Sequence, residues 1–213
     1  MKFYKGTITL DYIPKTRDLR VNFKGNNNKP FAFIVNVIHS KETRIGHWVA
    51  ISVNNQFPHC RKIIVRYFDS FGDSYLTYKA IATYIHNIKK LCQMHNYIFV
   101  LDTSKRVIQY YDSMLCGLYT AYFVCLVFQH CDSLSISNIF KHFKKDKRAN
   151  DARVLRFLEY NYPAKSCNHY EDVYGGRKAS LEQLIKVPTP FCPKLTFGLK
   201  KCFKHIKCDC QGP

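Results

Sequence analysis

The segment LCGLYTAYFVCLVF, residues 115–128, is apolar or aromatic along almost its whole length. It is too short to span a bilayer but long enough for a buried helix, so it requires a sizeable surrounding core. The residues just before it include the polar side chains Gln109, Asp112 and Ser113. We therefore expect a polar loop that leads into a buried helix beginning near Cys116. A chain of 213 residues is long enough to supply such a core.

Periodic segments on either side of this helix indicate the fold class. Runs rich in β-branched and aromatic residues predict strands, and apolar positions at helical spacing predict helices. The order of strands, helix, strands and helices favours an α+β fold with a mixed, largely antiparallel central sheet packed between helices. We expect one domain over residues 1–190 and a basic, cysteine-rich tail over 191–213. The predicted strands are 31–38, 47–54, 62–71, 97–102 and 106–111, and the predicted helices are 76–94, the segment after Cys116, and one or two within 135–162.

Cysteine content and charge suggest a compartment and a class of partner. The start of the chain lacks an apolar leader segment, and its ten cysteines are expected to be reduced, catalytic or metal-bound. We therefore expect an intracellular protein that is not secreted. Thirty-three Lys and Arg against 15 Asp and Glu give a net charge of +18, which attracts polyanions such as DNA without sequence preference. A generally basic surface without a specific ligand is the alternative.

Four residues in one chain order have the chemical types of a cysteine nucleophile and its helpers. A thiolate at Cys116 would be stabilised by the first turn of its helix, although a small buried cysteine is the alternative. His47 begins a predicted strand and Asp69 ends one, so a carboxylate can orient an imidazole if the two strands are neighbours. Gln109 lies seven positions before Cys116 and can donate to an oxyanion. Taken singly, His47 also fits a sheet-edge histidine and Asp69 a turn residue.

The ordered set GHW, YFDSFG and Q-x6-CG resembles the adenovirus protease family (adenain), and more broadly the clan of SUMO and ubiquitin-like proteases. The resemblance covers about residues 31–128 and implies a papain-like or adenain-like cysteine protease fold. It implies His47 as general base, Asp69 as orienting acid, Cys116 as nucleophile and Gln109 as oxyanion donor. Several features depart from the family: an Asp replaces the usual Glu, the gap from His47 to Asp69 is longer, and YYDSM, with an unexpected Asp112, follows the glutamine.

The resemblance also implies a substrate class and activators. It implies a cysteine endopeptidase that cleaves at Gly-Gly-X or Gly-X-Gly sites in viral capsid or virion precursor proteins. Such an enzyme would act as a monomer in the host nucleus or the virion, stimulated by DNA and by a basic peptide that ends in Cys-Phe. Two alternatives stay open. One is an isopeptidase that removes SUMO or ubiquitin, and the other is an inactive, basic nucleic-acid-binding virion protein.

Three features of the C-terminal region are open to more than one interpretation. The segment LKKCFK, residues 199–204, is similar to the family's activating peptide, so the tail can be a cis activator. Gly176-Arg177 is a candidate self-cleavage site or an ordinary Gly-Gly turn. Four residues are candidate zinc ligands, although their spacing is tighter than in common structural sites. These are Cys202, His205, Cys208 and Cys210, and a basic tail with reduced thiols is the alternative to the activator and zinc hypotheses.

Overall fold

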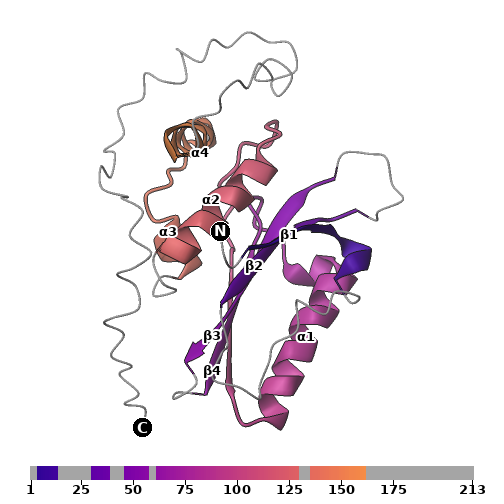
Figure 1. Cartoon of the computed structure of the whole chain (residues 1–213). Coiled ribbons are helices and arrows are strands. Elements are labelled where there is room, and N and C mark those ends of the chain that lie inside the picture. The colour runs from indigo at the N-terminus through magenta and orange to yellow at the C-terminus, as the bar shows by residue number, and fades with distance from the viewer. Residues whose placement is uncertain (1–3, 14–29, 39–45, 58–60, 130–134, 162–213) are drawn as a thin grey trace.

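A five-stranded mixed sheet forms the centre of the molecule (Figure 1). The computed structural model describes residues 4–13, 30–38, 46–57, 61–129 and 135–161. The central strands β2, β3 and β4 are antiparallel, while β1 pairs with β2 and β5 with β4 in parallel. The predicted α+β class with a mixed sheet is confirmed. In spatial order the strands are β1 (Tyr4–Thr9), β2 (Phe31–Asn36), β3 (Trp48–Phe57), β4 (Lys62–Phe68) and β5 (Ile98–Thr103).

Helices cover both faces of the sheet. Helix α1 (Lys79–Met94) lies against one face, and α2 (Cys116–Gln129), α3 (Ile136–Ile139) and α4 (Lys147–Asn161) lie on the other (Figure 1). Two short 3-10 segments, η1 (Leu10–Tyr12) and η3 (Tyr75–Thr77), complete the described elements. No helix among the described residues is long and apolar enough to cross a membrane.

Alternation along the strands builds a separate core on each face. Phe33 and Ile51 point toward α1, whereas Ala32 and Ala50 on the same strands belong to the core beneath α2. Side chains at successive strand positions point to opposite faces, so this is the two-residue period expected of strands covered on both sides. Helix α2 packs against the sheet and also against α4. Because it is covered on more than one side, its sequence is apolar almost all round.

Some sequence predictions about elements are wrong. Residues 106–111 do not form a strand, because the backbone N–H groups of Ile108 and Gln109 both donate to the carbonyl of Ser70 and fix a loop instead. Strand β4 ends at Phe68 rather than residue 71, because Asp69 to Gly72 form a turn. In that turn the Gly72 N–H donates to the Asp69 carbonyl at 3.1 Å, and Gly72 has φ +75°. Strand β1 was not expected from the sequence.

Several predictions lie outside the described residues. They are the boundary at 190/191, the candidate activating segment 199–204, the bond Gly176-Arg177, and the candidate zinc ligands Cys202, His205, Cys208 and Cys210. Within the described ranges, no group of three or more His, Cys, Asp or Glu side chains is placed to hold a metal ion.

Candidate active site

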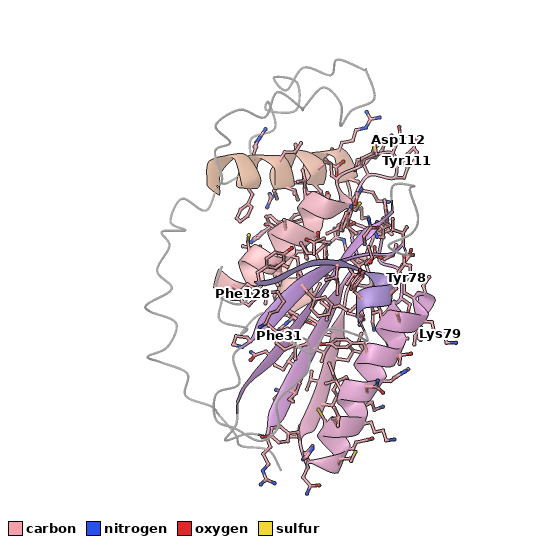
Figure 2. The ribbon with its side chains drawn as sticks, turned by 45° about the vertical axis from the view of Figure 1, so that its right-hand side comes forward. Phe31, Tyr78, Lys79, Tyr111, Asp112 and Phe128 are labelled. Atoms are coloured by element: carbon pink, nitrogen blue, oxygen red, sulfur yellow. The ribbon has the colours of Figure 1, made fainter. Side chains whose placement is uncertain are left out.

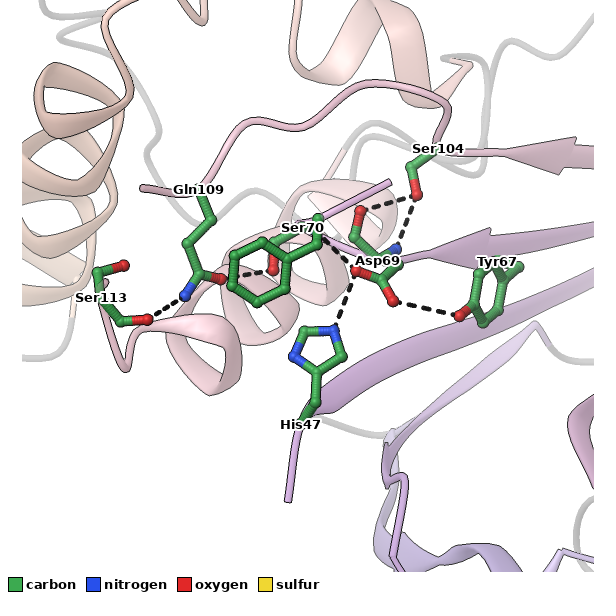
Figure 3. Close-up of polar contacts among 8 residues, drawn as sticks. His47, Tyr67, Asp69, Ser70, Ser104, Gln109 and Ser113 are labelled. Atoms are coloured by element: carbon green, nitrogen blue, oxygen red, sulfur yellow. Dashed lines mark hydrogen bonds and ion pairs between the residues drawn. The ribbon is translucent and has the colours of Figure 1, made fainter. Parts of the chain in front are cut away.

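The topology of the sheet brings His47 and Asp69 to the same edge. His47 immediately precedes β3 and Asp69 immediately follows β4, and these strands are antiparallel with Ala50 opposite Phe68. The start of one strand therefore lies beside the end of the other. His47 Nε2 is 3.0 Å from Asp69 Oδ1 (Figure 3). The His47 side chain is 17% exposed and that of Asp69 is fully buried, so this contact is largely shielded from water.

Hydrogen bonds fix the Asp69 carboxylate. Oδ1 also accepts from the Phe71 N–H at 2.7 Å, and Oδ2 accepts from the Tyr67 hydroxyl at 3.4 Å. Ser104 holds the backbone of Asp69: its Oγ accepts from the N–H at 2.8 Å and donates to the carbonyl at 2.9 Å (Figure 3). A buried carboxylate needs such donors, and here they also set its direction toward His47.

The surroundings of His47 favour its protonated form. Burial opposes the charge, but hydrogen bonds with Asp69 and Cys116, together with their negative charges, outweigh it and raise the pKa of His47 to about 9. The Phe71 ring packs on the imidazole at 5.0 Å between centroids, and the His47 carbonyl accepts from the Val37 N–H at 2.8 Å. Because Nε2 faces Asp69, the other ring nitrogen, Nδ1, is the one available to Cys116.

Cys116 is the first residue of α2 and is nearly buried, with 9% of its surface exposed. Helical hydrogen bonding starts just before it, where the Tyr119 N–H donates to the Leu115 carbonyl at 3.0 Å. The first N–H groups of a helix have no partner within the helix, so they can stabilise negative charge that develops at Cys116. Helix α2 packs on β3, and its Gly117 lies against the Trp48 indole.

Gln109 is fully buried and its side-chain amide is held in one orientation. Its Oε1 accepts from the Ser70 hydroxyl at 2.6 Å, and its Nε2 donates to the Ser113 carbonyl at 2.5 Å (Figure 3). An amide nitrogen carries two N–H groups, and the contact with Ser113 uses one of them. The contact with the Ser113 carbonyl settles which end of the amide is the donor, because a carbonyl can only accept.

The structure brings the sequence-predicted pair His47 and Asp69 into contact, and Cys116 lies near enough to contribute to the raised pKa of His47. Gln109 is present as an oriented donor on the loop before Cys116, although it lies on no strand. Sequence reasoning missed Ser70 and Ser104. Ser70 stands inside the quoted motif YFDSFG, whereas nothing in the sequence marks Ser104.

Two glycines near the site predict a matched pair of stability effects. A Cβ at Gly46 would lie 2.0 Å from Asn36 Oδ1 and 2.6 Å from Ile38 Cγ2, whereas one at Gly117 would lie 3.6 Å from Trp48 Cδ1. We expect Gly46→Ala to lower the free energy of unfolding by about 1–3 kcal/mol because the segment leading into His47 must shift. Gly117→Ala should change it by less than about 1 kcal/mol. Urea denaturation checks both, and equal losses would contradict the packing described.

Comparisons with known proteins give little beyond this geometry. No protein-family model matches the sequence. No curated protein matches it either. Among solved structures, the chain is similar to a crystal structure of the ASFV pS273R protease with a TM-score of 0.42 and 22% identity. The similarity covers 59% of this chain and 43% of that one, so the chain spans less than half of that protease's length. A likeness this weak assigns no role to any residue.

Proposed function

We propose that this chain is a cysteine endopeptidase with Cys116 as nucleophile, His47 as general base and Asp69 as the group that orients His47. The observation that carries the proposal is the position of His47, whose Nε2 lies 3.0 Å from Asp69 and whose ring also hydrogen-bonds Cys116. A thiol, an imidazole and a buried carboxylate in this order form the arrangement that activates a nucleophile.

In the proposed acylation step, the thiol proton already lies on Nδ1 of His47, whose pKa is raised to about 9, and the Cys116 thiolate attacks a peptide carbonyl carbon. The carbonyl oxygen becomes an oxyanion, which accepts hydrogen bonds from the second Nε2–H of Gln109 and from the backbone N–H of Cys116. The imidazolium then protonates the leaving amine as the C–N bond breaks, and a thioester remains. In deacylation His47 takes a proton from water, whose oxygen attacks the thioester and releases the acid and the Cys116 thiolate, which again faces the protonated His47.

The finer proposals concern substrates and activators. We propose cleavage at Gly-Gly-X or Gly-X-Gly sites in viral precursor proteins, by a monomer acting in the host nucleus or the virion. These proposals are supported by the resemblance in the motifs around His47, Asp69 and Cys116. Stimulation by DNA is supported by the net charge and by exposed basic side chains before and within α4, namely Lys141, Lys144, Lys145 and Arg148. A basic Cys-Phe peptide, or residues 199–204 of the chain itself, is the second proposed activator.

Labelling of the nucleophile tests the proposed function. The purified, reduced full chain is treated with a Gly-Gly peptide that carries a carbon electrophile, with and without DNA, and is analysed by intact mass and peptide mapping. We expect one adduct on Cys116, lost in His47→Ala, and faster labelling with DNA. The buried thiols of Cys92 and Cys125 serve as internal controls and should stay unlabelled in the folded protein. Labelling of other cysteines while Cys116 stays unmodified would contradict the proposal.

A second assay separates the two kinds of protease. Precursor-like peptides with internal Gly-Gly sites and ubiquitin-like proteins with a C-terminal Gly-Gly extension are offered in parallel at equal concentration. We expect the internal peptide to be cleaved with the higher kcat/KM. Preference for the ubiquitin-like substrate would replace the endopeptidase proposal with that of an isopeptidase.

A further inference from the structure

Two neighbouring buried polar residues on α4 face the loop that carries Gln109. Asn150 is 1% exposed and Asp151 is 4% exposed. The loop joins β5 to α2, and its outer residues Tyr111 and Asp112 lie beside α4 (Figure 2). Burial of two polar side chains costs free energy unless their hydrogen bonds are made, so the partners of this pair show what it holds.

Asn150 hydrogen-bonds two backbone segments, one in the loop that carries Gln109 and one just before α4. Its Nδ2 donates to the carbonyls of Ile108 and Lys144, both at 3.0 Å, and its Oδ1 accepts from the Lys144 N–H at 2.8 Å. Ile108 immediately precedes Gln109, whose N–H donates to the Ser70 carbonyl at 3.2 Å. The peptide group entering Gln109 is therefore fixed from the sheet side by Ser70 and from the α4 side by Asn150.

Asp151 connects the same loop to the helix of the nucleophile. Its Oδ1 accepts from the Tyr119 hydroxyl at 2.7 Å and from the Tyr110 N–H at 3.4 Å. Tyr119 lies one turn after Cys116 on α2, and its hydroxyl also lies 3.2 Å from the Ile108 carbonyl. One carboxylate thus joins the residue after Gln109 to the first turns of α2.

We infer that Asn150 and Asp151 are positioning residues for the reaction, which hold the Gln109 amide in register with Cys116. They contact neither substrate nor reacting atoms and act through Ile108, Tyr110 and Tyr119. The inference rests on the proposed function. It also gives a physical reason why the loop can carry YYDSM after the glutamine: α4 supplies the hydrogen bonds that fix the backbone.

Two measurements on the full chain test this inference. Hydrogen exchange of the loop amides between Ile108 and Ser113 measures how well the backbone is held, independently of catalysis. The rate of Cys116 labelling by the Gly-Gly electrophile, separated into kinact and KI, measures the chemical step and the binding step. The variants are Asp151→Ala and Asp151→Asn. The matched control is Asp146→Ala, because Asp146 Oδ1 accepts from the N–H groups of Arg148 and Ala149 and caps α4 without bonding the loop.

We expect Asp151→Ala to raise the exchange rate of the loop amides and to lower kinact at least tenfold with little change in KI. Complete removal of an oxyanion donor lowers kcat by a factor of about 10²–10³, and a displaced donor should cost part of that. Asp151→Asn keeps an acceptor at Oδ1 and should stay within about threefold of the wild type. Unchanged loop exchange in Asp151→Ala, or an equal loss of kinact in Asp146→Ala, would overturn the inference. A wild-type chain that never labels at Cys116 would instead overturn the proposed function, and the exchange data would still decide whether α4 fixes the loop.

Discussion

Between about pH 6 and about pH 10, the free energy of unfolding of the wild type is expected to fall by about 3 kcal/mol more than that of His47→Gln. The pKa of His47 is raised from 6.5 to about 9 in the folded chain. The folded state therefore holds a proton that the unfolded state has lost, and each unit of difference corresponds to about 1.4 kcal/mol. This stabilisation is complete below pH 6.5 and disappears as the pH rises through about 9.

Urea denaturation at a series of pH values measures this difference. Asp69→Asn is a useful second variant, because it removes the charge that faces His47 Nε2 while it keeps the size of the side chain. Its pH dependence should be intermediate between those of the wild type and His47→Gln. Parallel curves for the wild type and His47→Gln would show that the imidazole is not paired in the way the structure indicates.

Replacing Gln109 with Ala is expected to lower kcat by about 10²–10³ while KM changes little, because the amide binds an oxyanion that exists only after attack. Gln109→Glu has the same shape but places an acceptor, rather than a donor, beside the developing negative charge, and should be at least as damaging. Steady-state kinetics on a Gly-Gly peptide gives both constants.

Ser70→Ala provides the graded control for Gln109. It removes only the hydroxyl that donates to Gln109 Oε1, so the amide keeps its contact with the Ser113 carbonyl but loses one of the two contacts that hold it. We expect about a tenfold loss of kcat, smaller than that of Gln109→Ala. Because Gln109 is buried, thermal unfolding of each variant must accompany the kinetics. A loss of kcat that follows the loss of stability alone would argue against an oxyanion role.

The contact between His47 and Asp69 was predictable because it needs only one piece of information beyond the residues, namely that β3 and β4 pair as antiparallel neighbours. The placement of Gln109 was not predictable. Residues 106–111 have the composition of a strand, but the carbonyl of Ser70 takes the N–H groups that a strand would use. Tertiary hydrogen bonds overrode local propensity there.

The supporting residues were hidden for a related reason. Ser104 contacts Asp69 across 35 positions, and Asp151 contacts Tyr110 across 41. Serine and aspartate are common on surfaces, and only the docking of β5 on β4 and of α4 on α2 turns these two into buried partners. No periodicity or spacing in the sequence encodes which surface-type residue becomes such a partner.

The candidate site lies at the interface between two packed layers, the sheet and helix α2. The proposed acid–base pair belongs to the sheet, whereas the proposed nucleophile belongs to a helix that rests on it, and packing such as that of Gly117 on Trp48 helps to join the two parts. A shift of α2 along β3 by a fraction of an ångström would separate sulfur from imidazole while the imidazole and carboxylate stay together. If the proposed function holds, the rate of reaction at Cys116 therefore depends on how tightly α2 packs on β3.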